Sequence, residues 1–315
     1  MLPKREECDK ATQACSFRSF CPVSTHIIAH HRSGRCPALA RASDLLCVAP
    51  IFTQFSRHAE ALAASLPTDA SMLVVAGGDG TLSEVVNGLM QRPPEQRPPV
   101  LLIPAGSGND VARMLGLQRT PADVERRIFR PGSHTWDVIK ASLIGPSQQT
   151  LTRYGINVLS TGITAEVLRI FNRMMRRLPP DVGYAAAGVL AFSRYRAQPM
   201  EIIVDDYTQS YSPLVVAIAN SRWFGSGIGI APQAIADDGL LNLTTAHNIG
   251  PLGFLGLLPK LRKGAVLSDS RIRYSMGRCV QLRTPSPLGI EMDGEFIGFT
   301  PLTVEVIPNA IRLIT

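Results

Sequence analysis

The stretch VVAGGDGTLSEVVNG, residues 74–88, joins a strand-like run to a helix-like run through a glycine turn. The turn is Gly77-Gly78-Asp79-Gly80, and the apolar residues after it recur at the spacing of one buried helix face: Leu82, Val85, Val86, Leu89 and Met90. Glu84 and Asn87 fall on the opposite face. At the end of a parallel strand, glycines let backbone amides approach a phosphate, and the helix N-terminus adds a favourable partial charge. The stretch therefore predicts a strand, a ligand-binding turn and a helix.

This glycine turn differs from two common phosphate-binding loops. No Gly-Lys-Ser/Thr follows it, so it is not a Walker A loop, and its spacing is not that of the dinucleotide GxGxxG motif. Taken alone, it also fits a plain strand-to-helix turn in which Asp79 lies near the positive end of the helix dipole.

A second turn of the same design follows the apolar run VLLI. Residues 104–108, PAGSG, lead into a helix-like segment, NDVARMLGL, whose polar side carries Asn109, Asp110 and Arg113. Two glycine turns that open two helices, each with an acidic residue, predict a site for a polyphosphate with a divalent cation. The alternative is ordinary helix chemistry, in which Asn109 caps the helix and Asp110 pairs with Arg113.

The rest of the first half repeats the alternation of strand and helix. The apolar runs HIIA, DLLCVAPI, SMLVVA and PVLLIP are separated by helix-like segments, and a further helix, TPADVERRIF, is capped by Thr120. This rhythm predicts an α/β domain, a parallel sheet wound with helices, over residues 23–138. Short strands among Gly, Pro and Asp clusters then predict a mostly antiparallel, β-rich second domain over residues 139–301. Two helices are expected within it, near 165–178 and 251–261.

Composition narrows the class of partner. The 315 residues are 45% hydrophobic, which suits two domains, and they carry a formal charge of +7 with a pI near 9.3. This charge suits an anionic partner such as a nucleotide or an acidic membrane surface, or a surface simply decorated with arginines. Aromatic residues make up only 6% and do not alternate with basic ones, which argues against nucleic acid.

The N-terminal segment and the cysteines show no sign of secretion. No apolar run is long enough to span a bilayer, and residues 1–22 lack the apolar core of a secretory signal. We therefore expect a cytoplasmic protein with a disordered leader over residues 1–22. The cysteines form no CxxC pair and no zinc-like spacing with histidine, so free thiols are expected. They are Cys8, Cys15, Cys21, Cys36, Cys47 and Cys279.

Both turns and several later motifs resemble one known family. GGDGTLSEVVNGL followed by IPAGSGNDVARMLGL looks like the catalytic domain of the diacylglycerol kinase family in its bacterial lipid-kinase form, which is related to sphingosine and ceramide kinases. TQFSRHAEALA, GINVLSTGITAEV, NSRWFGSGIGIAPQAIADDGLLNL and EMDGEFIGFTP resemble further motifs of that family, in the right order. The resemblance implies ATP and Mg²⁺ between an α/β domain and a β-rich domain, a lipid hydroxyl as acceptor, and a last strand, about 302–315, that returns to the first domain.

The resemblance also implies roles for individual residues. Glu295, in the Asp-Gly-Glu motif, is the favoured base for the lipid hydroxyl, and Asp79 is the competing candidate. Asp293-Gly294 before it is expected to form a tight hairpin turn. The first loop, His30-His31-Arg32-Ser33-Gly34, departs from the Asn-Pro-x-Ser-Gly of the family. The positions implied to bind ATP are Arg32, Thr53, Gly77, Gly78, Asp79, Gly80, Thr81, Glu84, Gly106, Ser107, Asn109 and Asp110.

Metal ligands are implied at two places. The acidic positions implied to hold Mg²⁺ are Asp79, Asp110 and Asp137. For Asp137 the alternative is a surface aspartate between strand residues. The segment IADDGLLNL resembles a second, structural metal site formed by Ile235, Asp238 and Leu240. There the alternative is a plain hairpin turn at Asp238-Gly239.

Two segments suit an anionic membrane surface. AEVLRIFNRMMRRL combines apolar residues in one predicted helix with four arginines, Arg169, Arg173, Arg176 and Arg177. PLGFLGLLPKLRKG has a similar composition. For both segments the alternative is a core helix with solvated basic residues. We therefore expect a peripheral membrane protein that meets a lipid substrate.

Two other functions remain open at this point. A soluble NAD kinase shares the Gly-Gly-Asp-Gly-Thr sequence, although the GSGND segment favours the lipid branch. A nucleotide-binding protein that docks on membranes without catalysis is the second alternative, because of the altered first loop. The acyl-chain pocket would be lined by generic apolar residues, so the sequence does not identify the lipid, and it leaves a homodimer open.

Overall fold

The N-terminal domain is built on a parallel sheet. The computed structural model describes residues 24–175 and 177–315. The strands of this sheet lie in the order β2-β1-β3-β4. They are β1 (Thr25–Ala29), β2 (Ile51–Phe52), β3 (Met72–Gly77) and β4 (Val100–Pro104). Every residue of β3 and β4 is buried, as expected for parallel strands that are covered on both faces.

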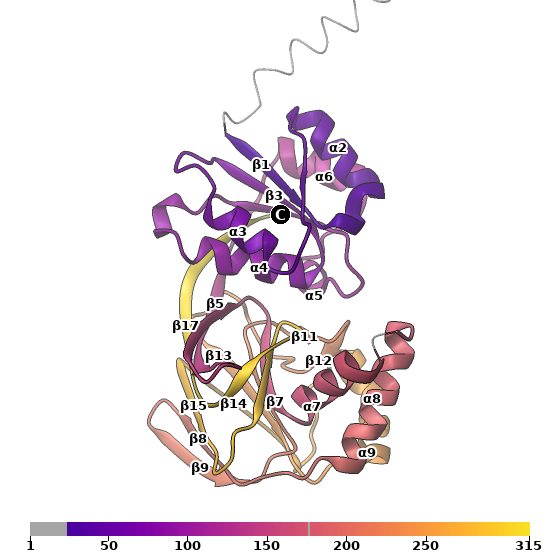
Figure 1. The fold of residues 1–315 in the computed structure, drawn as a ribbon, viewed down its shortest axis with the longest axis vertical. Helices are drawn as coiled ribbons and strands as arrows, with labels where there is room; N and C mark the ends of the chain where they lie inside the picture. The colour runs from indigo at the N-terminus through magenta and orange to yellow at the C-terminus, as the bar shows by residue number, and fades with distance from the viewer. Residues whose placement is uncertain (1–23, 176) are drawn as a thin grey trace, which may run out of the picture.

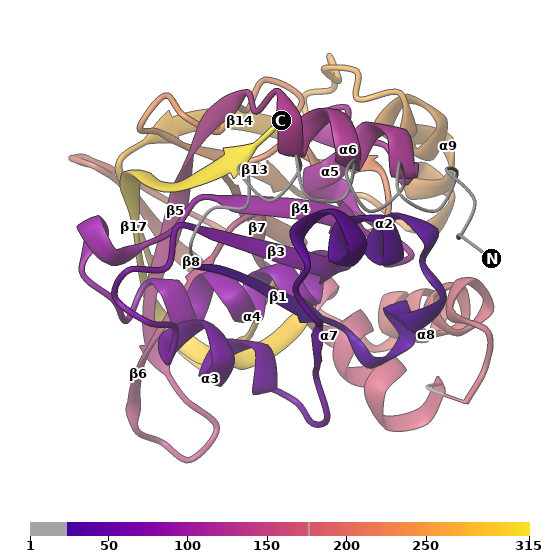
Figure 2. The same ribbon diagram turned by 90° about the horizontal axis from the view of Figure 1, so that it is seen from above.

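Helices cover both faces of this sheet. They are α2 (Pro37–Leu46), α3 (His58–Ala64), α4 (Asp79–Leu89), α5 (Asp110–Met114) and α6 (Pro121–Phe129). Val74 packs with α2 and α6, whereas Val75 packs with α3 and α4, because successive strand residues point to opposite faces. Figure 2 shows β4, β3 and β1 between these two layers. Short 3-10 turns, η2 (His31–Arg35) and η3 (Pro94–Gln96), lie in the connections.

The C-terminal domain is a mostly antiparallel, β-rich structure. Its strands are β5 (Ser133–Ile144), β6 (Thr150–Gly155), β7 (Val158–Gly162), β8 (Met200–Val204), β9 (Tyr207–Tyr211), β10 (Val215–Ala219), β11 (Trp223–Phe224), β12 (Ile228–Gly229), β13 (Leu241–Ala246), β14 (Ile272–Gly277), β15 (Cys279–Arg283), β16 (Gly289–Met292) and β17 (Glu295–Ile314). Val216 of β10 and Ile202 of β8 pack in one apolar cluster, although their strands lie in separate branches of the sheet. The sheet therefore folds over and encloses the core between two layers.

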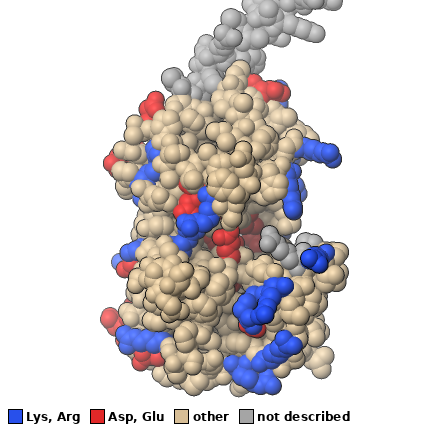
Figure 3. Space-filling view, in the orientation of Figure 1, with Lys and Arg blue, Asp and Glu red and all other residues tan. Residues whose placement is uncertain are grey.

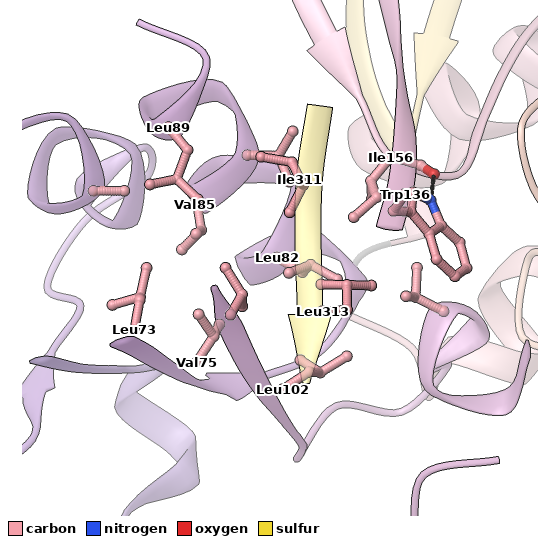
Figure 4. Packing of buried hydrophobic residues seen from close by; sticks show 14 of the residues in the cluster. Leu73, Val75, Leu82, Val85, Leu89, Leu102, Trp136, Ile156, Ile311 and Leu313 are labelled. Carbon is pink, nitrogen blue, oxygen red and sulfur yellow. Dashed lines mark hydrogen bonds between the residues drawn. The ribbon is translucent and has the colours of Figure 1, made fainter. Parts of the chain in front are cut away.

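The long strand β17 joins the two domains, and it is the yellow strand of Figure 1. It pairs antiparallel with β16, β15 and β5, and Leu313 near its end lies in parallel register with Val100 of β4. Figure 4 shows Ile311 and Leu313 meeting the core of the N-terminal domain. In the same view the Trp136 ring nitrogen donates a hydrogen bond of 2.9 Å to the Ile156 carbonyl oxygen.

Helical segments of the C-terminal domain lie together beside its sheet (Figure 1). They are α7 (Ile163–Ile170), the π-helical η4 (Phe171–Met175), α8 (Pro180–Arg194) and α9 (Pro251–Arg262). The predicted helix 165–178 is thus shorter and ends in a π-helical turn. The described ranges contain no helix that is long and apolar enough to cross a membrane.

Two helices were not expected from the sequence. The run DLLCVAPI was expected as a strand, yet Asp44 to Leu46 end α2, whose buried stripe uses two alanines with Leu39 and Leu46. The helix α8 contains Gly183 and Gly188, which disfavour helices. Gly183 has a packing reason, because a Cβ atom there would lie 2.7 Å from the Phe171 ring. The predicted leader, 1–22, and its three cysteines lie outside the described residues.

Candidate active site

The two glycine turns touch each other at the carboxyl ends of β3 and β4. The amide of Ala105 donates a hydrogen bond of 2.8 Å to the Gly77 carbonyl oxygen. A Cβ atom on Gly106 would lie only 2.4 Å from the Gly78 Cα atom, so the contact requires glycine. Gly80, by contrast, is exposed, and a Cβ atom there would meet nothing within 4 Å. The N-terminus of α4 is therefore open toward solvent at this position.

Asp79 ties the second turn to the first. Its two carboxylate oxygens accept hydrogen bonds from the amides of Asp110, at 3.1 Å, and Val111, at 3.2 Å, which are the first two residues of α5. Asp79 is itself the first residue of α4. One side chain thus fixes the distance between the N-termini of two helices, where anions are stabilised.

Asp110 is buried beside Asp79. Burial first, and then the repulsion by Asp79, raise the pKa of the Asp110 carboxyl to about 6. Its Oδ1 accepts a hydrogen bond of 3.0 Å from the Arg113 guanidinium, as the helix alternative predicted. Two adjacent carboxylates of this kind favour a bound cation, because a cation removes the repulsion between them.

A loop of the C-terminal domain closes over these carboxylates. The amide of Ser226, between β11 and β12, donates a hydrogen bond of 2.9 Å to Oδ2 of Asp110. The Arg113 guanidinium lies 5.8 Å from the centre of the Trp223 ring. The backbone of Ser226 is left-handed, with φ of 67°. Asp110 therefore contacts both domains.

Asn109 does not cap α5 with its side chain, contrary to the helix alternative. It adopts a left-handed conformation with φ of 53°, and its carboxamide instead bonds to Gly106. Oδ1 accepts from the Gly106 amide at 3.0 Å, and Nδ2 donates to the Gly106 carbonyl oxygen at 2.7 Å. Asn109 therefore fixes the second turn, and Asp79 takes over the capping of α5.

The remaining positions implied to bind ATP differ in how deeply they are buried. The Thr81 side chain packs against Gly77, and Thr53 is buried after β2. Arg32 and Ser107 are exposed. The altered first loop is attached to the same sheet edge, because the Ser33 hydroxyl donates a hydrogen bond of 3.1 Å to the Ala76 carbonyl oxygen.

Glu84 caps α3 from the middle of α4. Its carboxylate accepts hydrogen bonds from the amides of Arg57, at 2.9 Å, and Ala59, at 3.0 Å. Asn87 lies on the predicted face opposite the apolar one, and it is buried. Its carboxamide bonds to both the amide and the carbonyl oxygen of Tyr154 in β6, because the C-terminal domain packs on α4.

The Asp-Gly-Glu segment forms the predicted tight hairpin. Asp293 and Gly294 have φ values of 51° and 85°, and Met292 pairs directly with Glu295. Burial chiefly raises the pKa of the Glu295 carboxyl, and the charge of Glu84 raises it further. The guanidinium of Arg153 opposes this shift. Glu295 therefore lies near α4, the helix that begins at the first glycine turn.

Asp293 is a site residue that sequence reasoning missed. Its carboxylate accepts hydrogen bonds from three consecutive amides, those of Ile156, Asn157 and Val158, at 2.9, 3.0 and 3.0 Å. Burial raises the pKa of this carboxyl, and the backbone amides and the neighbouring Ser83 side chain of α4 oppose that shift. An Asp-Gly turn could be read from the sequence, but partners so distant along the chain could not.

Asp137 and the segment 235–240 form a separate cluster. Asp137 is fully buried, unlike a surface aspartate, and its carboxylate accepts 2.7 Å hydrogen bonds from the amides of Gly239 and Asn309. Oδ1 of Asp238 accepts from the amide of its neighbour Leu240 at 3.0 Å. Burial chiefly raises the pKa of the Asp137 carboxyl, and the charges of Asp238 and Asp237 raise it further.

These carboxylates do not form a ready-made metal centre. Across 24–175 and 177–315, no three His, Cys, Asp or Glu side chains gather closely enough to hold an ion. Mg²⁺ in kinases binds to one or two carboxylates together with substrate phosphates. Asp79 and Asp110 fit that requirement, since each keeps lone pairs beyond those that accept amides.

Comparison with known proteins identifies the family. Residues 31–141 match the family model of the diacylglycerol kinase catalytic domain, and residues 157–315 match that of the YegS C-terminal NAD kinase beta sandwich-like domain. The chain belongs to the diacylglycerol kinase family of lipid kinases. The first matched range contains both glycine turns, and the second contains the Asp-Gly-Glu hairpin.

Relatives of this diacylglycerol kinase family member cover most of its length. The protein named "Diacylglycerol kinase" of Mycobacterium tuberculosis H37Rv is 29% identical over 262 residues, 82% of this chain and 81% of that protein. "Probable lipid kinase YegS-like" of Shewanella frigidimarina is 25% identical over 252 residues, 79% and 78% of the two chains. A crystal structure of a diacylglycerol kinase from Bacillus anthracis strain Sterne shares the fold, with a TM-score of 0.68, 19% identity and coverage of 92% and 96%.

Proposed function

We propose that this lipid kinase uses ATP and Mg²⁺ to phosphorylate the hydroxyl group of a membrane lipid. The observation that carries the proposal is the Asp79 bridge between the two glycine turns. It places the open N-terminus of α4 beside a pair of repelling carboxylates. Backbone amides there suit phosphates, and the carboxylates suit the cation that accompanies them.

The chain supplies positioning and charge for this reaction. The open backbone at Gly78 and Gly80 would hold the β- and γ-phosphates, with hydroxyls from Thr81 and Ser107. Asp79 and Asp110 would hold Mg²⁺, which neutralises charge on the phosphates when it is bound. The loop that carries Ser226 contacts Asp110 and would help to exclude water.

Glu295 is the better candidate for the base. Both oxygens of Asp79 already accept amide hydrogen bonds, whereas the Glu295 carboxylate accepts none from the described residues. Its raised pKa also makes it more basic than an exposed glutamate. In the proposed step the lipid oxygen bonds to the γ-phosphorus, its proton moves to Glu295, and the bond to the leaving ADP oxygen breaks.

We further propose that the helical face of the C-terminal domain meets the membrane. It is made by η4, α8 and α9, where Phe192 of α8 and Phe254 of α9 approach with ring centroids 6.0 Å apart. Leu252 is 84% exposed, and Val189 is 73% exposed. The exposed apolar side chains of this face are Met174, Leu178, Val182, Tyr184, Val189, Leu252 and Leu255.

Basic residues accompany this apolar face, and Figure 3 shows Lys and Arg gathered on the right of the lower half. Exposed examples are Arg173, Arg177, Arg194, Lys260 and Arg262, while Arg176 lies outside the described residues. Arg169 instead pairs with Glu166 at 2.7 Å. Apolar side chains framed by cations suit an anionic lipid surface.

The test is phosphate transfer from γ-labelled ATP. Phosphatidylcholine vesicles would carry one acceptor at a time, diacylglycerol, ceramide, sphingosine or phosphatidylglycerol, and NAD would serve as a soluble acceptor. We expect labelled lipid that extracts into organic solvent and disappears when Mg²⁺ is chelated. Failure to label a lipid under any condition would refute the proposal. Labelled NADP would instead support the NAD kinase alternative.

A further inference from the structure

The hairpin that carries Glu295 is attached to α4 by polar contacts rather than by apolar packing alone. The carboxylate of Asp293 is enclosed by the three amides of residues 156–158 at the bend between β6 and β7, and the Asp293 amide donates a hydrogen bond of 2.9 Å to the Val158 carbonyl oxygen. Consecutive amides that converge on one carboxylate form an anion-binding nest. The hairpin tip is therefore held to this bend by both the side chain and the backbone amide of Asp293.

The same bend is fixed to the helix of the first glycine turn. Ser83 and Asn87 lie one turn apart on α4, and both are buried. The Ser83 side chain lies beside the Asp293 carboxylate, and Asn87 bonds to the backbone of Tyr154 at 3.0 and 2.5 Å. The two side chains form a polar seam between the domains, with Asp293 at one end.

We propose that Asp293 is a positioning residue, which sets the place of Glu295 relative to the glycine turns through the amide nest and Ser83. Glu295 is separated from Asp293 only by Gly294. Asp293 and Gly294 both have a left-handed backbone, which restricts the conformation of the hairpin. Without the nest, the Glu295 carboxylate could still accept a proton, but its position relative to α4 would no longer be fixed. This inference rests on the proposed function of Glu295 as the base.

Charged groups on several elements act on the Glu295 carboxyl. They are Glu84 on α4, Arg153 on β6, Arg57 before α3, and Asp293 itself. The negative charge of Asp293 raises the pKa of Glu295, so a neutral residue there lowers it. Ser83→Ala keeps this charge, so a shift of the pKa of Glu295 in that variant would report a change in the position of Glu295.

Asp205 provides a matched control in the same domain. It occupies the turn between β8 and β9 with φ of 50°, and its Oδ1 accepts 2.9 Å hydrogen bonds from the amides of Arg278 and Cys279. It is thus another left-handed hairpin aspartate with an amide nest, but it lies away from α4 and Glu295. Asp205→Asn reports the general cost of weakening such a nest.

The experiment compares Asp293→Asn, Asp205→Asn and wild type in the vesicle assay. We expect Asp293→Asn to lower kcat roughly 10-fold or more with KM for ATP nearly unchanged, which is the pattern for an interaction used in the transition state. The acidic limb of its kcat profile should move to lower pH. Asp205→Asn should change neither kcat nor the profile. Equal effects of the two substitutions would overturn the inference.

Two further arms keep the result interpretable. If Asp293→Asn does not fold, Ser83→Ala removes the α4 contact alone and should still lower kcat several-fold, and an unchanged kcat would count against the inference. Carbon NMR titration of glutamate-labelled protein, with Glu295→Gln to assign the signal, reads the pKa of Glu295 without turnover. A downward shift in Asp293→Asn but not in Asp205→Asn is expected, and no shift would contradict it. Normal turnover by Glu295→Gln would instead refute Glu295 as the base, which is a separate failure.

Discussion

The Asp79 carboxylate accepts a hydrogen bond of 3.1 Å from the amide of Asp110, and the charge of Asp79 helps to raise the pKa of the Asp110 carboxyl to about 6. The Asp79 carboxylate thus attracts the backbone amide of Asp110 and repels the carboxylate of the same residue. This arrangement holds two helix N-termini together while leaving a demand for positive charge between them.

The contact between the glycine turns should tolerate no side chain. Gly106→Ala would place a methyl group 2.4 Å from the Gly78 Cα atom, so the turns must separate. We expect a loss of about 1–3 kcal/mol in unfolding free energy, and a fall in kcat/KM for ATP of at least roughly 10-fold. Denaturant unfolding and steady-state kinetics measure the two effects.

Gly188→Ala is the control for this substitution. Gly188 lies inside α8, and a Cβ atom there would meet nothing within 4 Å. Alanine should leave turnover unchanged and stabilise the helix by about 0.5–1 kcal/mol. Equal kinetics for the Gly106 and Gly188 variants would argue against a functional role for the glycine contact.

The buried seam should contribute to stability through Asn87. Asn87→Ala leaves the amide and carbonyl oxygen of Tyr154 without their side-chain partner, which should cost about 1–3 kcal/mol in unfolding free energy. Gln118→Ala, at an exposed position, should cost almost nothing. Chemical denaturation of both variants tests this, and equal unfolding midpoints would show that the domains do not depend on the seam.

The sequence predicted the elements that follow local rules. The glycine turns, the helices after them and the Asp-Gly hairpin depend on neighbouring residues, and Thr120 caps α6 as its spacing indicated. Contacts between distant segments were not readable. Asn87 faces solvent on an isolated helix, and only the docking of Tyr154 from the other domain buries it. Asp293 gains its partners from the bend between β6 and β7 for the same reason.

Helices without a strong apolar pattern were missed. The α2 stripe relies partly on alanines, which contribute little to apolar periodicity, and α8 contains glycines that helix propensity disfavours. Gly183 is explained by the close approach of Phe171, which is a tertiary contact. Packing between elements therefore determines that these segments are helical, which local propensity does not predict.

A buried glutamate should make stability depend on pH. Glu291 accepts a hydrogen bond from Ser160, and burial raises the pKa of its carboxyl to about 7. Because the folded state holds this proton more tightly than the unfolded state, stability is fully present below the ordinary glutamate pKa of 4.5 and is lost as pH rises toward 7. The loss amounts to about 3 kcal/mol.

Glu291→Gln removes this titration. The variant should be less sensitive than wild type to a change from acidic to alkaline pH, and more stable than wild type at alkaline pH. Glu305→Gln, at an exposed glutamate, should keep the wild-type pH dependence. Thermal unfolding across pH measures the slopes, and parallel curves for wild type and Glu291→Gln would exclude the buried carboxyl as their source.

If the helical face made by η4, α8 and α9 contacts the membrane, its exposed apolar residues should determine binding to vesicles. The double variant Leu252→Asp and Leu255→Asp should reduce co-sedimentation with phosphatidylglycerol vesicles by roughly 10-fold or more, since two apolar side chains are lost from the contact. Tyr207→Asp removes an exposed aromatic side chain from β9 and should not change binding. Unchanged binding by the double variant would place the membrane contact elsewhere.

Phosphate transfer by Glu295→Gln, measured beside wild type with labelled ATP, Mg²⁺ and lipid vesicles, tests the central claim most directly. Wild type should label a lipid, and the variant should do so roughly 100-fold more slowly while binding ATP equally well, because only proton removal is lost. Near-normal transfer by the variant would contradict Glu295 as the base and return that role to Asp79, and failure of wild type to label any lipid would contradict the proposed activity itself.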